Sequence, residues 1–212
     1  MAFIALIGIP GCGKSSLARS LSAKFNIHSY CEPEENYWPE AVLMSDIPGS
    51  FTSVSWFRSM RVPALFKAKK MSDLGAHCIV DSYYDKLMYK YIDKDGLNWF
   101  ISQKDPYYDL IYDMSKKDYA ELPNADVVLA IRITPKLWRD FLQSRGRKVD
   151  GSLAFNENCF SLQEPMLKAA KSFANDYKKE YIEILQDEFC FKAIEEKALF
   201  SLGTLGIKLK AK

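Results

Sequence analysis

The residues with the clearest chemical potential lie near the N-terminus of the 212-residue sequence. Residues 8–15 read GIPGCGKS and match the pattern G-x-x-x-x-G-K-[ST], after an apolar segment and before an amphipathic one. In such a loop the backbone N–H groups bind phosphate oxygens, the lysine adds a positive charge, and the serine hydroxyl reaches a magnesium ion. We therefore predict a phosphate site formed by Gly8, Gly11, Cys12, Gly13, Lys14, Ser15 and Ser16.

A phosphate loop does not reveal what happens to the phosphate, and both kinases and GTPase switches use one. Asp46-Ile47-Pro48-Gly49 satisfies the D-x-x-G pattern of the switches, but so short a pattern is common by chance. Their guanine-reading N-K-x-D pattern is missing, and residues 102–105, which read SQKD, come nearest to it. The sequence favours a kinase over a switch.

Five apolar segments alternate with segments that have a helical pattern. Leu17, Leu21 and Phe25 recur every four residues, which indicates one buried helix face. The predicted strands are 3–7, 27–31, 77–80, 126–133 and 181–185, and the predicted helices are the segment from Lys14, 52–74, parts of 82–124, the segment after Thr134, 163–179 and 187–201. Pro63 is expected to kink or end a helix. The alternation predicts an α/β fold with a parallel sheet between helices.

Composition excludes several classes of protein. The net charge of +2 does not indicate a nucleic acid or a membrane surface as a partner. The five cysteines have neither metal-ligand nor disulfide-scaffold spacing, and reduced thiols fit the cytoplasm best. Without a signal peptide, a long apolar run or a linker, residues 1–212 are expected to form one cytoplasmic domain.

The second predicted strand ends in Cys31-Glu32-Pro33, and Tyr37-Trp38 follow. With the phosphate loop, these residues resemble the deoxyribonucleoside kinases, which are related to the thymidylate kinases. The resemblance implies a three-layer P-loop kinase fold whose five-stranded parallel sheet has the order 2-3-1-4-5, with helices on both faces. It also implies ATP as the phosphoryl donor, Mg²⁺ as the metal, and Glu32 as the base that accepts a 5′-hydroxyl proton. Tyr37 and Trp38 would then contact the substrate.

The third predicted strand leads into Asp81-Ser82-Tyr83, which resembles an acidic-Arg-Ser element of that family. By this resemblance Asp81 supports Mg²⁺ together with Ser15 and lies at the substrate. The arginine of the element, which contacts phosphates, is replaced here by Ser82. Three explanations stay open: another arginine takes its place, the substrate differs, or the activity is weak.

Other arginines have family counterparts. Phe57-Arg58 is similar in placement to a Phe-Gln pair whose polar member contacts the nucleobase, so Arg58 is expected to read the base. Arg61 lies one turn further on the same helix face and is predicted to contact a phosphate. Arg145-Gly146-Arg147 resembles the family's lid, predicted around residues 143–150, whose guanidinium groups would stabilise the charge of the γ-phosphate. Lys14, Glu32, Arg145 and Arg147 form the predicted catalytic set.

Together these features predict ATP-dependent phosphorylation of the 5′-hydroxyl of a (deoxy)nucleoside. A thymidylate-kinase-like nucleotide kinase is a second interpretation, because Glu-Pro also occurs in thymidylate kinases. A third is a nucleotide-dependent switch or binding protein without rapid transfer, because the arginine at position 82 is missing. The expected partner is a small-molecule substrate, and a homodimer is left open.

Overall fold

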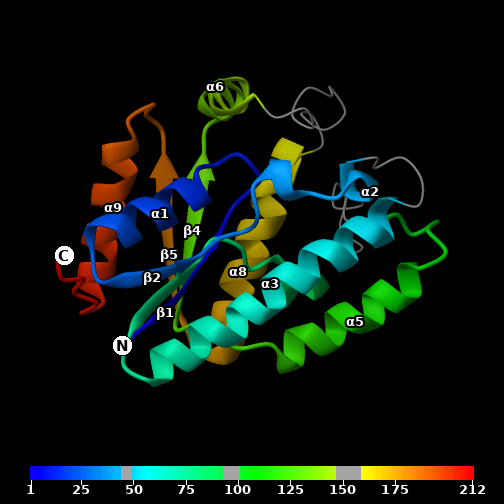
Figure 1. Cartoon of the computed structure of the whole chain (residues 1–212), viewed down its shortest axis with the longest axis horizontal. Helices are drawn as coiled ribbons and strands as arrows, with labels where there is room; N and C mark the ends of the chain where they lie inside the picture. The colour runs from blue at the N-terminus through cyan, green and yellow to red at the C-terminus, as the bar shows by residue number, and fades with distance from the viewer. Residues whose placement is uncertain (44–48, 93–100, 147–158) are drawn as a thin grey trace.

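The architecture is a five-stranded parallel sheet with helices on both faces (Figure 1). The computed structural model describes residues 1–43, 49–92, 101–146 and 159–212. The strands are β1 (Phe3–Ile7), β2 (Ile27–Tyr30), β3 (His77–Val80), β4 (Val127–Ile133) and β5 (Glu180–Gln186). Their order is β2-β3-β1-β4-β5, and each neighbouring pair is parallel. Both features confirm the predicted fold class.

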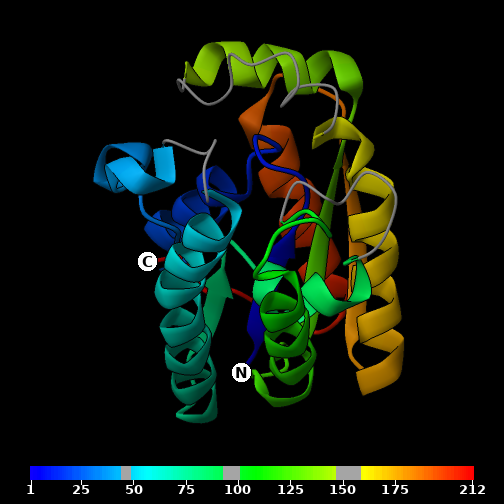
Figure 2. The ribbon, with the colours of Figure 1, turned by 90° about the vertical axis from the view of Figure 1, so that its right-hand side faces the viewer.

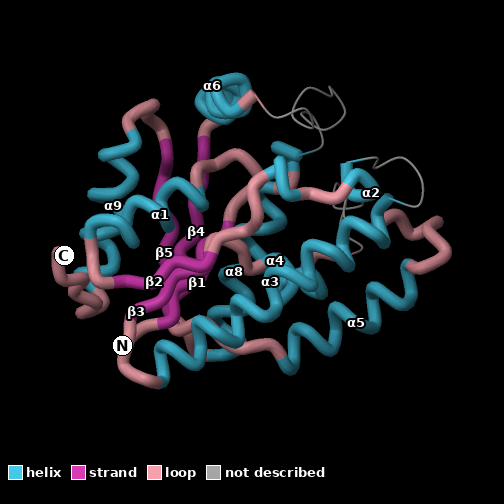
Figure 3. The backbone as a smooth tube through the Cα atoms, in the orientation of Figure 1, coloured by secondary structure: helices cyan, strands magenta, loops and turns pink. Residues whose placement is uncertain are grey.

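The helices form two layers around the sheet, which lies between them in Figure 3. On one face lie α1 (Lys14–Lys24) and α9 (Phe191–Thr204), and on the other lie α3 (Gly49–Asp73) and α8 (Gln163–Tyr177), with α5 (Tyr108–Glu121) beside α3 (Figure 2). The shorter helices are η1 (Glu35–Tyr37), α2 (Glu40–Leu43), α4 (Tyr84–Leu87) and η2 (Met88–Lys90). Helix α6 (Pro135–Arg145) lies across the edge where the strands end (Figure 1). Within the described ranges, no helix is long and apolar enough to cross a membrane.

The central strand explains the apolar run at the start of the sequence. All five residues of β1 are buried, because β3 and β4 flank the strand and helices cover both of its faces. Because β1 is held in the centre of the sheet and ends at Ile7, the glycine-rich loop begins at the edge of the sheet.

The structure refines the sequence prediction at Pro63 and at the ends of several elements. Pro63 lies inside α3 and does not end it, and Leu65 and Ala68 beyond it are buried against the core. Tertiary packing on both sides of the proline therefore holds the helix together despite the lost hydrogen bond. Strand β5 extends to 180–186, and the last helix begins at Phe191 and not at residue 187.

Lys86 is an unusual member of the core between α5 and α8. Its side chain is fully buried, Nζ donates one hydrogen bond of 2.6 Å to the Leu122 carbonyl oxygen, and the centroid of the Tyr177 ring lies 4.9 Å from Nζ. Burial lowers the pKa of Lys86 from 10.5 to about 8, and the carboxylates of Asp118 and Glu121 oppose this effect only in part.

Lys86 should therefore make stability depend on pH. Between pH 8 and 10.5 the folded state releases the Lys86 proton while the unfolded state still binds it, so the free energy of unfolding rises with pH. We expect urea unfolding to show a rise of about 2 kcal/mol from pH 7 to 9.5 that is absent in Lys86→Met. Equal pH dependence in the two proteins would contradict this assignment.

Candidate active site

The loop between β1 and α1 is closed by hydrogen bonds to its own first carbonyl group. The Gly8 carbonyl oxygen accepts bonds from Lys14 Nζ at 2.8 Å and from the Tyr84 hydroxyl at 2.7 Å. Lys14 Nζ also donates to the Ile9 carbonyl oxygen at 3.0 Å, and its side chain is buried. The ammonium group thus lies inside the loop, where a phosphate bound by the loop would meet a positive charge.

Two of the loop glycines are required by geometry. Gly11 has a φ of +83°, and a Cβ atom there would lie 2.6 Å from Leu142 Cδ2. A Cβ atom on Gly8 would lie 2.8 Å from the Ile131 carbonyl oxygen, which belongs to the neighbouring strand β4. The loop therefore fits closely under α6 and against the sheet.

The loop leads directly into α1, and a second helix, α6, is hydrogen-bonded to the loop. Gly13 is the N-cap of α1, Ser15 is half-buried behind it, and Ser16 is exposed. The first-turn N–H groups of α1 therefore face the loop, as an anion site requires. Trp138 Nε1 of α6 donates to the Pro10 carbonyl oxygen at 2.7 Å. Cys12 is buried at the turn, as a small residue that fills space.

Glu32 and Asp81 follow neighbouring parallel strands and meet at the same edge of the sheet. The Asp81 N–H donates to the Tyr30 carbonyl oxygen at 3.1 Å, which continues the β2–β3 ladder by one bond. In return, the Glu32 N–H donates to Asp81 Oδ1 at 2.9 Å. The Asp81 carboxyl group is therefore fixed relative to the backbone of Glu32.

Asp81 is the residue best suited to support a cation. It is 2% exposed, and its Oδ2 atom has no hydrogen-bond partner among the described residues. Burial and the charge of Glu32 raise the pKa of Asp81, while the Ser15 hydroxyl and Lys14 oppose this shift. A buried, unpartnered carboxylate oxygen next to a serine hydroxyl fits a magnesium ion held by Ser15 and Asp81.

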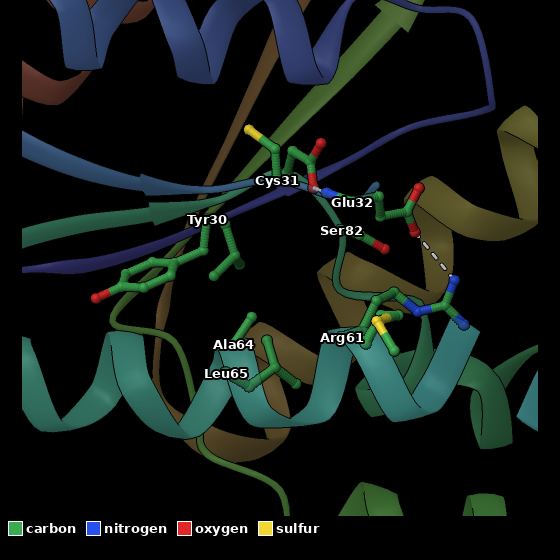
Figure 4. Close-up of a pocket in the computed structure, with 10 residues that line it drawn as sticks. Tyr30, Cys31, Glu32, Arg61, Ala64, Leu65 and Ser82 are labelled. Atoms are coloured by element: carbon green, nitrogen blue, oxygen red, sulfur yellow. Dashed lines mark hydrogen bonds and ion pairs between the residues drawn. The ribbon is translucent and has the colours of Figure 1, made fainter. Parts of the chain in front are cut away.

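Arg61 of α3 binds two carboxylates, and Figure 4 shows its bond to Glu32. Its Nε and Nη2 atoms donate to both oxygens of Asp85, at 2.6 and 3.1 Å, and its Nη1 atom donates to Glu32 Oε1 at 3.0 Å. Arg61, Glu32 and Asp81 also line one pocket, together with Ser82, whose buried hydroxyl has no partner among the described residues. A guanidinium from α3 therefore lies at the pocket that Ser82 lines.

Arg58, one turn earlier, has a different environment. Its Nε and Nη2 atoms bind both oxygens of Asp118 at 2.7 Å, which ties α3 to α5. These contacts engage one edge of the guanidinium in a structural ion pair. The reading of a nucleobase by Arg58 stays a prediction.

The predicted aromatic residues are only partly brought together. Trp38 and Phe57 contact each other edge to face, with ring centroids 5.0 Å apart, and Trp38 Nε1 donates to the Pro33 carbonyl oxygen at 2.9 Å. Phe57 also lies under the Arg61 guanidinium, 5.4 Å away. Tyr37 is exposed and has no such contact among the described residues. Phe57 thus contacts Arg61, and Trp38 packs against Phe57.

The predicted lid is described only in part. Arg145 is the half-buried last residue of α6, and Gly146 ends the helix in a left-handed conformation. Arg147 and the rest of the predicted lid lie outside the described residues, as does Asp46 of the D-x-x-G pattern.

Sequence reasoning missed Asp85, Tyr84 and Asp118. Tyr84 and Asp85 follow Asp81 within four residues, so their closeness to the third strand end was a usable signal. Asp118 lies 60 positions from Arg58, and no local pattern links the two.

No family model matches the chain, and no curated protein matches its sequence. Solved structures do match. A deoxyadenosine kinase from M. mycoides with bound dATP has a TM-score of 0.67 at 22% identity, and the match covers 96% of this chain and 100% of that chain. A thymidylate kinase from Candida albicans has a TM-score of 0.63 at 15% identity, with 99% and 97% covered. These similarities show that the chain has the P-loop kinase fold.

Asp81→Asn tests the metal assignment. The amide keeps an oxygen for the Glu32 N–H group but removes a buried charge, so we expect the ligand-free variant to be about 1 kcal/mol more stable than the wild type. It should lose the extra thermal stabilisation that Mg²⁺ adds to ATP in the wild type. Thermal unfolding with ATP in EDTA or in Mg²⁺ measures both effects. A variant that responds to Mg²⁺ as the wild type does would argue against Asp81 as a metal ligand.

Proposed function

We propose that the protein is an ATP-dependent kinase that phosphorylates the 5′-hydroxyl of a (deoxy)nucleoside. The observation that carries this proposal is the charge of the pocket between α3 and the ends of β2 and β3. Its charged lining residues are Glu32, Asp81 and Arg61, and the guanidinium of Arg61 is already bound by two carboxylates. Such a pocket has no excess positive charge, which suits a neutral acceptor better than a dianionic phosphate.

Each residue then has a distinct task in the reaction. Glu32 accepts the proton of the acceptor hydroxyl, and Lys14 and the loop N–H groups hold the phosphates of ATP in line with it. Ser15 and Asp81 would hold Mg²⁺, which would supply positive charge to the phosphates of ATP. We also predict that Arg145 and Arg147 close over the γ-phosphate.

A nucleotide kinase of thymidylate type is the second candidate. A thymidylate kinase is among the similar structures, with coverage as complete as that of the deoxyadenosine kinase. Such an enzyme must bind the phosphate of its acceptor, so it would need a cation that Arg61 does not offer while Asp85 and Glu32 bind it. The charge of the pocket therefore favours the nucleoside.

A panel of acceptors separates these candidates. Purified protein with ATP and Mg²⁺ is given deoxynucleosides or their 5′-monophosphates, and the formation of ADP is followed. We expect nucleosides to be favoured by about tenfold or more in kcat/KM, since 1.4 kcal/mol of charge repulsion suffices for that ratio. Lys14→Ala should abolish transfer in the same assay. Preference for a monophosphate would indicate the nucleotide kinase, and transfer to no acceptor would indicate a switch or binding protein.

Glu32→Gln tests the role of the base. The amide cannot accept the hydroxyl proton, so we expect kcat to fall by roughly 10²- to 10⁴-fold while the Kd for ATP stays unchanged. Glu34→Gln is the matched control, because Glu34 pairs with Arg19 and has no assigned role. Stopped or continuous assays of ADP give kcat, and an unchanged kcat in Glu32→Gln would remove Glu32 from the reaction.

A further inference from the structure

Arg61 is deeply buried, and it donates two hydrogen bonds to Asp85 but only one to Glu32. It is 7% exposed, and its two bonds to Asp85 involve a carboxylate that is 2% exposed. Its third bond reaches Glu32, whose side chain is 25% exposed at the rim of the pocket. Asp85 is thus the buried anchor of the arginine, and Glu32 is the partner that an acceptor can reach.

The anchor determines the direction of the third bond. Two parallel bonds to one carboxylate fix the plane of a guanidinium, and the two N–H bonds of Nη1 then lie in that fixed plane. The rings of Phe57 and Tyr84 lie 5.4 and 5.6 Å from the guanidinium carbon and limit its movement further. Glu32 Oε1 accepts the resulting bond at 3.0 Å (Figure 4).

Glu32 is consequently held at two points. Its backbone N–H group is bound to Asp81, and its Oε1 atom is bound to Arg61. Among the contacts of the described residues, none occupies Oε2. That oxygen is the one available to accept a proton from a hydroxyl at the pocket.

We propose that Asp85 and Arg61 form a positioning pair that aims the Glu32 carboxylate at the acceptor hydroxyl. This inference rests on the proposed function, because it takes Glu32 as the base. Asp85 acts only through Arg61, and Arg61 acts through Glu32. A loss of alignment between the base and the reacting hydroxyl lowers kcat, whereas neither Asp85 nor Arg61 belongs to the predicted ATP site.

A double-mutant cycle tests the pair. Arg61→Met alone leaves the Asp85 charge buried without a partner and lowers stability, so Arg61→Met/Asp85→Asn, which removes that charge, is the main variant. We expect kcat to fall about tenfold in Asp85→Asn and about 100-fold in the double variant. Adding Asp85→Asn to Arg61→Met should lower kcat no further, because Asp85 has no other route to the base. The Kd for ATP should not change.

Two further measurements separate positioning from a general structural effect. Guanidinium ions at millimolar concentration should restore part of kcat in Arg61→Ala, in which Asp85 remains to bind them. Asp73→Asn, which breaks an exposed ion pair with Lys69 on the same helix, should keep the kcat of the wild type.

The outcomes distinguish this inference from the proposed function. An active wild type with a double variant within threefold of its kcat would overturn the positioning pair and leave the proposed function intact. A parallel loss of ATP affinity and kcat would also overturn the pair, because it would show a structural role. A wild type that transfers phosphate to no acceptor would overturn both.

Discussion

All five strands are parallel, so their carboxyl ends must meet at one edge of the sheet, and the candidate site depends on this constraint. The glycine-rich loop follows β1, Glu32 follows β2, and Asp81 follows β3, which lies between the other two. Groups that are about 25 and 50 positions apart in sequence thereby become neighbours. Helix α6, which follows β4, completes the edge by holding the loop through Trp138.

Several buried charged groups are concentrated at this edge. Asp81, Asp85 and Arg61 are each less than 10% exposed, whereas the strands behind them present apolar side chains. Burying charged groups costs several kcal/mol unless they pair well, so apolar residues would give a more stable fold. Under the proposed function, the cluster would bring a cation ligand, a base and a fixed guanidinium to one place.

Local patterns predicted the elements more reliably than the partners of charged side chains. The β1 run, the glycine-rich turn from β1 into α1 and the strands that end just before Glu32 and Asp81 are local features, and the structure has each of them within one residue of its predicted place. Arg58 and Arg61 share one face of α3, and nothing in their spacing reveals that one binds Asp118 on α5 and the other binds Asp85 and Glu32. Those pairings depend on how helices pack, which periodicity does not specify.

The most direct measurement is a crystal structure with a non-transferable ATP analogue, Mg²⁺ and a deoxynucleoside. The account predicts the 5′-hydroxyl oxygen within hydrogen-bonding distance of Glu32 Oε2, with Oε1 still bound to Arg61 and the metal beside Ser15 and Asp81. An acceptor bound away from Glu32, or one whose phosphate displaces Asp85 or Glu32 from Arg61, would contradict the account.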